Sequence, residues 1–215
     1  MAYIRYARIV LFVCGLAAIA ATSPPRAAAE EAGFEALFDG KSLDGWKAGE
    51  NPGSWKVVDG EIVCHGPRSH LFYVGKGDEP AEWKNFHFKA EVMTKPKANS
   101  GIYFHTKFQE SGWPTVGHEA QVNTTHGDPV RTGSLYNVVK NLSAPSKDDE
   151  WFTEEVIVEG KRIVTKVNGK SIVDHVEKTD EIKDGRKLSK GTFALQAHDP
   201  GSEVHYRNIR VKRLP

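Results

Sequence analysis

Short segments in which apolar and polar residues alternate recur along most of the chain. The clearest covers residues 85–93, where every second position from Phe86 to Val92 is apolar and polar residues such as Glu91 stand between them. Successive side chains of a β-strand point to opposite faces of its sheet, so this period of two predicts strands with one buried face. No segment longer than about ten residues shows the 3.6-residue period of an amphipathic helix. The pattern therefore favours an all-β fold.

Turn-forming residues separate these segments. Asp59-Gly60, Glu159-Gly160 and Asn168-Gly169 each lie between two alternating segments, which is typical of two-residue hairpin turns. The chain contains 20 glycines and 11 prolines, which suits many turns. About a dozen short strands joined in this way predict a sandwich or barrel of antiparallel sheets. We also expect residues 134–139 to form a strand.

The C-terminal segment, residues 204–214, breaks the simple alternation. Ile209 and Val211 share their face with Arg207 if the strand is regular. Either Arg207 lies under the sheet with a partner, or a bulge near Asn208 changes the register.

The first 29 residues have the pattern of a secretory signal peptide. Arg5 and Arg8 precede an apolar run over residues 9–21, and the small residues 27–29 offer a cleavage site. The run is short for a membrane span, although an uncleaved anchor is the alternative. We therefore expect a signal peptide at 1–29, a linker at 30–33 and one domain at 34–215. The mature protein would be exported, periplasmic or extracellular, and free of the membrane.

The composition and net charge limit the classes of binding partner to expect. The 215 residues are 39% hydrophobic and 27% charged, which is enough for a packed core. The net charge of +1 gives no electrostatic argument for binding nucleic acid or a membrane surface. After signal removal Cys64 would be the only thiol, so no intramolecular disulfide is expected and a packed structural role is favoured over a nucleophile. The sequence carries no signal for an oligomeric state.

Two segments combine the alternation with reactive side chains. They are residues 98–105, Ala-Asn-Ser-Gly-Ile-Tyr-Phe-His, and residues 117–121, Gly-His-Glu-Ala-Gln. Alternation places Tyr103, His105 and Lys107 on one face of the first strand, and Glu119 and Gln121 on one face of the second. A Glu, a Gln, a His and a Tyr on one sheet face are suited to binding a saccharide or a metal ion.

The order of several motifs along the chain resembles that of a known family. The motifs are Leu37-Phe38-Asp39-Gly40-Lys41-Ser42-Leu43-Asp44-Gly45-Trp46, Trp55-x-x-x-Asp59-Gly60, Phe86-x-Phe88-x-x-Glu91, Asn99-Ser100-Gly101-Ile102, Gly117-His118-Glu119-Ala120-Gln121, Gly133-Ser134-Leu135-Tyr136, Val167-Asn168-Gly169, Leu195-Gln196-x-His198 and Tyr206-Arg207-Asn208-Ile209. Together, over about residues 34 to 214, they are similar to the 3-keto-disaccharide hydrolase domain of exported bacterial proteins. The resemblance implies a concanavalin A-like jelly-roll β-sandwich of two antiparallel sheets that acts on sugars oxidised at carbon 3.

Two residues depart from the pattern of that family. The family often has Arg where His105 stands, and it commonly has Asp where this chain has Asn123. Each change points to an altered substrate, altered use of a metal, or lost catalysis.

The candidate catalytic residues are Glu119, His105 and Glu91. An ordinary glycosidase uses two carboxylates, and Glu91 and Glu119 could form such a pair if their strands are neighbours. On a 3-keto sugar, a base could instead remove the acidic hydrogen on carbon 2, so that the group on carbon 1 leaves by elimination before water adds. Glu119 or His105 could be that base. A metal, or donors such as Lys107 and Gln121, could hold the developing enolate.

Further residues are expected to bind substrate. Trp113 lies in a Gly-Trp-Pro loop and could stack on a sugar ring. The other candidates for lining a cleft are Asn99, Tyr103, Tyr136, Gln196 and His198. A divalent metal ion could be held by Glu119 with His126 and Asp128, which are suitable ligand types without the spacing of a known closed motif.

We expect an exported hydrolase or lyase that cleaves 3-keto-glycosides or 3-keto-disaccharides. The alternative is a non-catalytic carbohydrate-binding module of the same jelly-roll fold. A secreted adhesion or scaffold domain would require an exposed apolar patch, and no long apolar edge favours it.

Overall fold

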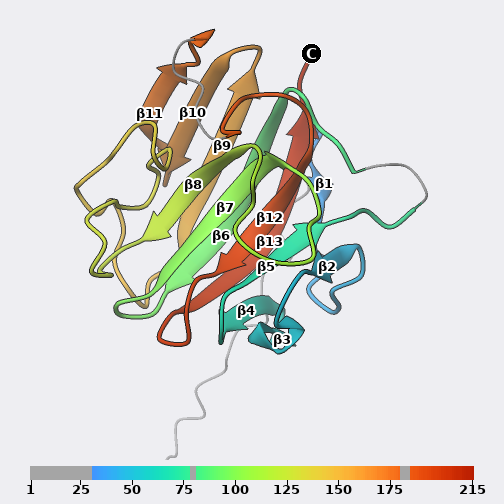
Figure 1. The fold of residues 1–215 in the computed structure, drawn as a ribbon, viewed down its shortest axis with the longest axis vertical. Helices are drawn as coiled ribbons and strands as arrows, with labels where there is room; N and C mark the ends of the chain where they lie inside the picture. The colour runs from blue at the N-terminus through green and yellow to red at the C-terminus, as the bar shows by residue number, and fades with distance from the viewer. Residues whose placement is uncertain (1–30, 78–80, 180–184) are drawn as a thin grey trace, which may run out of the picture.

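The structure, a computed structural model, describes residues 31–77, 81–179 and 185–215, and within these ranges it is built from strands (Figure 1). The strands are β1 (Glu35–Ala36), β2 (Trp46–Ala48), β3 (Trp55–Val58), β4 (Glu61–His65), β5 (Ser69–Tyr73), β6 (Phe86–Thr94), β7 (Asn99–Thr106), β8 (His118–Asn123), β9 (Phe152–Glu159), β10 (Arg162–Val167), β11 (Lys170–Val176), β12 (Thr192–Ala197) and β13 (Glu203–Arg213). A short 3₁₀-helix covers Pro52–Ser54, and the described ranges contain no α-helix. The expected signal peptide lies outside the described residues, and no helix within them is long and apolar enough to cross a membrane.

The described strands form two antiparallel sheets that pack face to face. The larger sheet has the order β11-β10-β9-β6-β13-β4-β3, with β1 also beside β13, and the smaller has the order β2-β5-β12-β7-β8. Neighbouring strands such as β6 and β13, or β5 and β12, are far apart in the sequence, so the chain crosses repeatedly between the sheets. The predicted two-sheet sandwich is confirmed.

The predicted hairpins are present. Asp59 and Asn168 both adopt a φ of 49°, and each is followed by a glycine of positive φ, as a tight turn between β3 and β4 or between β10 and β11 requires. The strand expected at residues 134–139 is wrong. Leu135 makes only isolated bridges, because the chain turns back there and the N–H groups of Val138 and Val139 both donate to its carbonyl oxygen.

The C-terminal strand contains a bulge near Asn208, which is the second of the two alternatives left open by its sequence. Asn208 has a φ of 51°, and the register between β13 and β6 shifts between Arg207 and Arg210. As a result Tyr206 and Ile209 both point into the core, although they are three positions apart and would lie on opposite faces of a regular strand. Arg207 therefore faces outward.

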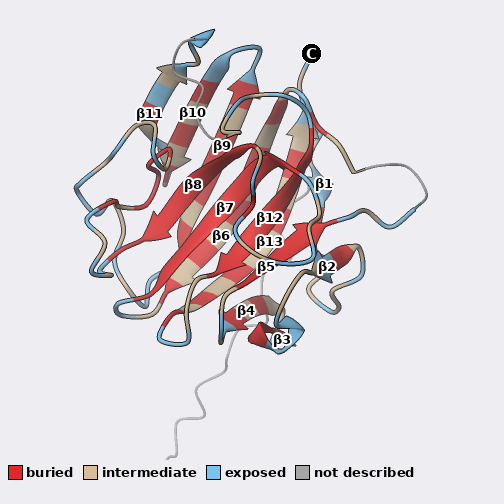
Figure 2. Cartoon of the chain, in the orientation of Figure 1, coloured by how far each residue is buried: buried red, intermediate tan, exposed pale blue. Residues whose placement is uncertain are grey.

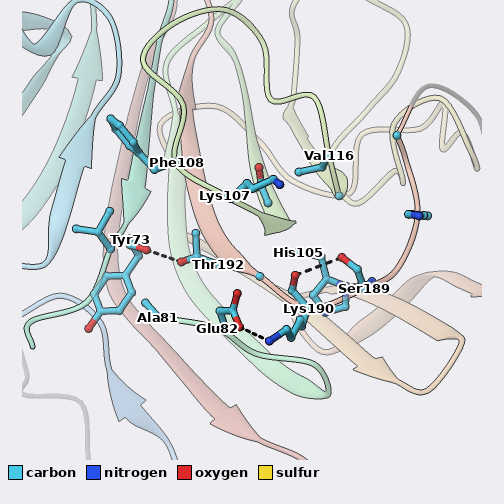
Figure 3. Close-up of a pocket in the computed structure, with 16 residues that line it drawn as sticks. Tyr73, Ala81, Glu82, His105, Lys107, Phe108, Val116, Ser189, Lys190 and Thr192 are labelled. Atoms are coloured by element: carbon cyan, nitrogen blue, oxygen red, sulfur yellow. Dashed lines mark hydrogen bonds and ion pairs between the residues drawn. The ribbon is translucent and has the colours of Figure 1, made fainter. Parts of the chain in front are cut away.

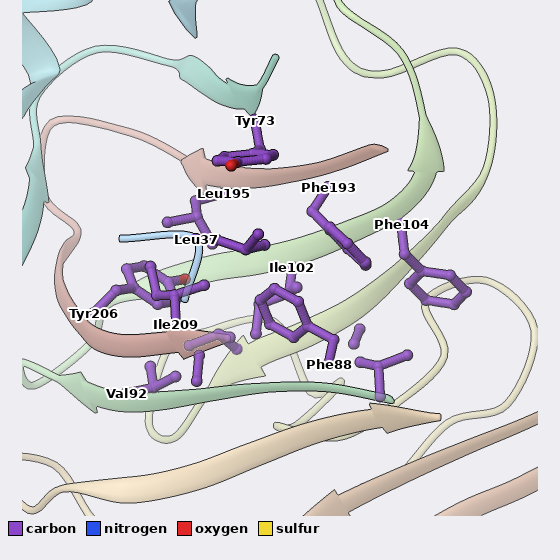
Figure 4. Packing of buried hydrophobic residues seen from close by; sticks show 14 of the residues in the cluster. Leu37, Tyr73, Phe88, Val92, Ile102, Phe104, Phe193, Leu195, Tyr206 and Ile209 are labelled. Atoms are coloured by element: carbon purple, nitrogen blue, oxygen red, sulfur yellow. The ribbon is translucent and has the colours of Figure 1, made fainter. Parts of the chain in front are cut away.

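The core fills the space between the two sheets (Figures 2 and 4). Phe193 of the smaller sheet contacts Phe86 and Phe88 of the larger one, with ring centroids 4.9 and 4.7 Å apart. Burying one such side chain contributes roughly 1.5–3 kcal/mol, so the interleaved rings hold the sheets in a defined position. Cys64 lies in this core as a free thiol, which agrees with the packed structural role, and burial raises its pKa to about 12.

Candidate active site

A cavity of about 290 Å³ lies on the face of the smaller sheet that points away from the core. Ile102 of β7 and Ala120 of β8 point into the core. The residues that alternate with them along each strand therefore face away from the core. The cavity is lined by Asn99, Tyr103, Trp113, Glu119, Gln121, Tyr136, Arg186, Gln196 and His198. All of them except Arg186 were candidates from the sequence, and the structure brings these candidates together.

Glu119 lies at the base of this cavity and is 3% exposed. Gln196 donates from its Nε2 atom to Oε1 of Glu119 over 2.9 Å. Burial raises the pKa of Glu119 to about 7, against the opposing effects of Tyr103, Arg186 and Gln196. A carboxyl group that titrates near neutral pH can accept a proton and give it back, which is what a general acid–base catalyst requires.

Gly101 makes room for the Glu119 side chain. A Cβ atom at position 101 would overlap Oε1 of Glu119, and it would also lie 2.9 Å from the Glu119 Cγ atom. Gly101 pairs with Gln121 on the neighbouring strand, so the Glu119 side chain can lean across β7 only because this residue has no side chain. The glycine of the Asn-Ser-Gly-Ile motif is thus part of the site.

Amide groups line the rest of the cavity floor. Gln121 donates to Oδ1 of Asn99 over 2.9 Å, and Gln196 donates to the Tyr103 hydroxyl over 3.1 Å. These bonds fix the orientation of the amides, and rigid donors and acceptors are what recognition of sugar hydroxyls needs.

His198 is held by its neighbour Asp199. The Nδ1 atom of His198 lies 2.7 Å from Oδ2 of Asp199, which also accepts a hydrogen bond from Ser202. Although burial pushes the pKa of Asp199 up, its hydrogen bonds with His198, Ser202 and Gly201 lower it below the usual value. With Nδ1–H donating to this carboxylate, Nε2 is the ring nitrogen of His198 that can take up or release a proton. The sequence analysis missed Asp199 because Asp-Pro-Gly has the pattern of an ordinary turn.

Arg186 is the other residue that sequence reasoning missed. It stands in a stretch rich in exposed charges, and no local pattern separates it from its lysine neighbours. The segment is tied to β8, because Glu177 accepts the N–H of Leu188 over 2.7 Å and pairs with Nε2 of the buried His118 over 3.0 Å. The Arg186 guanidinium lies 5.8 Å from the Tyr136 ring and lowers the pKa of Glu119.

His105 does not share a face with Tyr103, so this expectation is wrong. A bulge at the end of β7, where His105 has a φ of 53°, turns its side chain away. Its Nε2 atom donates to the Lys84 carbonyl over 2.9 Å and its Nδ1 atom accepts the N–H of Ser189 over 3.1 Å. Burial lowers the pKa of His105 to about 4, so the ring is neutral.

His105 and Lys107 line a different cavity, of about 460 Å³, shown in Figure 3. Glu82 and Lys190 form an ion pair of 2.8 Å on its rim. Lys107 is therefore separated from the cavity of Glu119, because it follows the bulge that redirects the end of β7.

Glu91 cannot pair with Glu119, because β6 and β8 belong to different sheets. Instead Glu91 accepts hydrogen bonds from Nε of Arg207 over 2.7 Å and from Asn208 over 3.0 Å. Arg207 in turn lies 3.9 Å from the centroid of the Trp151 ring. Burial alone would raise the pKa of Glu91, but the bonds from Asn208 and Arg207 outweigh it and the pKa is lowered.

The suggested metal ligands are not arranged as a metal site. His126 accepts the N–H of Asp128 at its Nδ1 atom over 3.1 Å, and Asp128 accepts the N–H of Val130 over 2.8 Å. Across residues 31–77, 81–179 and 185–215, no three His, Cys, Asp or Glu side chains are grouped so that they could hold a metal ion. Glu119, His126 and Asp128 therefore do not form the predicted set.

Asn123, the second departure from the family pattern, organises the loop that follows β8. Its amide nitrogen donates to the carbonyl groups of Asp128 and Val130, over 2.9 and 2.8 Å. Its Oδ1 atom accepts from the N–H of His126 and from Arg131. An aspartate could not make the two donor contacts, so the asparagine suits the conformation of this loop.

The protein is thus an antiparallel β-sandwich with a polar cavity on one sheet face and a buried carboxyl group within that cavity. Residues 33–212 match the model of the 3-keto-alpha-glucoside-1,2-lyase-like domain, and the chain belongs to this family. A relative named 3-keto-disaccharide hydrolase, from Bacteroides thetaiotaomicron, is 25% identical over 85% of this chain and 79% of its own length.

Solved structures share the fold. A protein from Parabacteroides distasonis described as a candidate glycosyl hydrolase has a TM-score of 0.72 at 22% identity, covering 85% of this chain and 94% of that one. A carbohydrate-binding module from Bacillus subtilis has a TM-score of 0.55 at 13% identity, covering 78% and 95%. The concanavalin A-like jelly-roll fold expected from the sequence is confirmed.

Proposed function

We propose that this protein is an exported enzyme that cleaves 3-keto-glycosides, including 3-keto-disaccharides, by elimination followed by addition of water. The observation that carries the proposal is the buried Glu119, whose pKa of about 7 lies in the range of a general base, in a sugar-sized cavity of a chain from this family. The signal-peptide pattern of residues 1–29 supports action outside the cytoplasm.

In the proposed reaction Glu119 takes the proton from carbon 2, which the neighbouring ketone makes acidic. The electron pair of the broken C–H bond forms a double bond between carbons 1 and 2, and the bond from carbon 1 to the leaving oxygen breaks. His198, protonated on Nε2 and held by Asp199, gives a proton to that oxygen. Water then adds across the double bond, with hydroxyl on carbon 1 and the proton returned to carbon 2.

Arg186 and the amide of Gln121 are the groups of this cavity that could stabilise negative charge on the ketone oxygen as the enolate forms. Among the described residues that line the cavity, Glu119 is the single carboxyl group. A direct hydrolysis of the ordinary kind uses two carboxyl groups that flank the bond, so this lining favours the elimination route.

The experiment is turnover of a 3-keto-glucoside by the purified protein and by the Glu119→Gln variant. Loss of the base should reduce kcat by roughly 10²–10⁴-fold, with an unchanged unfolding temperature. Equal turnover by both proteins would contradict the proposal.

A carbohydrate-binding module is the second candidate, because the polar cavity could hold a sugar without cleaving it and one similar structure is named as such a module. Sugar binding with no release of the leaving group from any 3-keto-glycoside would favour this alternative.

A further inference from the structure

His70 is a buried histidine of β5 whose two ring nitrogens have no hydrogen-bond partner among the described residues. Only 2% of the residue is exposed, and burial lowers its pKa to about 3, so the ring is neutral. A neutral imidazole offers one N–H donor and one nitrogen acceptor. Buried polar atoms without partners cost folding free energy, and they are found in native proteins mainly where a ligand or water meets them.

His70 lies beside the cavity of Glu119. The ring is 5.2 Å from that of Tyr103 and 5.4 Å from that of Trp113, and both neighbours line the cavity. His70 is also paired in register with Gln196, whose Oε1 atom is buried and has no partner in the described part of the chain. Three unpartnered polar atoms therefore belong to two neighbouring residues at this point beside the cavity.

Trp113 covers this point and is itself 42% exposed. The backbone of its loop is fixed, because Glu50 accepts the N–H of Gly112 over 3.1 Å and Gln109 donates to the Trp113 carbonyl over 2.9 Å. Among the described residues, the indole ring has ring contacts with His70 and His198, and the Arg68 guanidinium lies 5.2 Å from its centroid. The ring can thus turn outward without breaking the hydrogen bonds of the loop.

We propose that His70 and Gln196 form the floor of a second sugar subsite, where Trp113 now packs against His70 and would stack on the second sugar of a bound disaccharide. The inference rests on the proposed function, and it assigns this subsite to the leaving-group sugar. Gln196 joins the two subsites, since its Nε2 atom contacts Glu119 while its strand lies next to that of His70. Adjacent strands are about 4.8 Å apart, a distance comparable with one pyranose ring.

The chemistry of the floor suits a sugar hydroxyl. A hydroxyl donates one hydrogen bond and accepts others, so it can meet the unpartnered acceptor of Gln196 and the donor of His70 together. An aromatic ring above and polar groups below are a common arrangement for binding a pyranose, whose faces are apolar and whose edges are polar.

The test compares a 3-keto-disaccharide with methyl 3-keto-glucoside, which has no second sugar, in the His70→Phe variant. We expect KM for the disaccharide to rise about tenfold, as for one lost hydrogen bond, with kcat and both constants for the methyl glucoside unchanged. The variant should unfold at the same temperature or a higher one, because it removes unpartnered polar atoms. His70→Gln, which keeps a donor and an acceptor, should retain part of the preference for the disaccharide and guards against overpacking by phenylalanine.

Phe72→Leu is the control for packing, because Phe72 lies on the same strand and face, packs with Tyr103, Ala194 and Phe108, and carries no polar side-chain atom. This variant should change KM for the disaccharide and KM for the methyl glucoside by the same factor. If His70→Phe raises KM equally for both substrates, or for neither, the inference of a second subsite is overturned.

Failure of the proposed function gives a different result, namely that the wild-type protein turns over neither substrate. Calorimetric binding of the unoxidised disaccharide and methyl glucoside then tests the subsite by itself. His70→Phe must weaken disaccharide binding alone, and absence of any disaccharide binding by the wild type would also overturn the inference.

Discussion

At the scale of single residues, burial decides what Glu119 can do. Its carboxyl group is removed from water on a sheet face, while Arg186, Tyr103 and Gln196 act in the opposite direction and keep the pKa at about 7. An exposed strand glutamate would be fully ionised at neutral pH and a weaker base.

The proposed base must be deprotonated to act, so kcat/KM should rise with pH through about 7. Arg186→Ala removes a positive charge that favours the carboxylate, which raises the pKa of Glu119 and moves the rising part of the profile to higher pH. The pH dependence of kcat/KM for both proteins measures this. A profile that falls through this range would instead make Glu119 the acid.

Glu91 provides the contrasting case of a carboxylate held for structure. Glu91→Gln weakens the bonds with Arg207 and Asn208, and we expect a loss of about 1 kcal/mol of stability with unchanged turnover. Chemical denaturation and a turnover assay check both parts. A large loss of activity at unchanged stability would restore Glu91 as a catalytic candidate.

At the scale of elements, the β7–β8 pair supplies much of the site, and a bulge in β7 decides where the site ends. Regular alternation places Tyr103, Glu119 and Gln121 on one face. The bulge at His105 ends this regularity, and the side chains beyond it enter another cavity. The same device in β13 keeps Tyr206 and Ile209 in the core.

Gly101→Ala tests the packing between these two strands. The new Cβ atom must displace the Glu119 carboxyl group, so turnover should fall by at least about 100-fold while the unfolding temperature changes by only a few degrees. Alanine at Gly53, where a Cβ atom meets nothing within 4 Å, is the matched control and should retain full activity. Normal turnover in Gly101→Ala would show that the position of Glu119 is not critical.

At the scale of the whole molecule, the core itself contains a carboxyl group. Glu154 of β9 is 0% exposed, and neither of its oxygens has a hydrogen-bond partner among the described residues. Burial raises its pKa well above the usual value. The N–H of Gly133 opposes this only weakly, because it donates to the Gln121 carbonyl over 2.9 Å.

Because the folded state keeps this proton where the unfolded chain loses it, stability should fall as the pH rises above the unfolded pKa of Glu154, 4.5. Glu154→Gln removes this dependence, so its advantage over the wild type should grow with pH by up to about 1.4 kcal/mol per unit. Denaturation at a series of pH values measures the difference. Parallel curves for the two proteins would contradict the buried, protonated state.

Much of the fold could be predicted because alternation and turn chemistry are local. The β6 pattern and the Asp59-Gly60 and Asn168-Gly169 turns follow from steric preferences of neighbouring residues, whereas the bulge near Asn208 was one of two alternatives that the sequence left open. The prediction of a strand at 134–139 was wrong because the apolar residues there pack in a turn. A short apolar pattern does not distinguish such a turn from a strand.

The sequence by itself determined most of the strands, their two faces where the alternation is regular, and most of the polar residues that line the cavity, since these depend on side-chain alternation within one strand. Only the tertiary structure decided which strands are neighbours, and so it separated Glu91 from Glu119 and brought Arg186 and His70 to the site. Strand order arises from contacts between residues far apart in the chain, and burial arises from the whole sandwich. The pKa of Glu119 and the unpartnered nitrogens of His70 therefore become visible only in the folded protein.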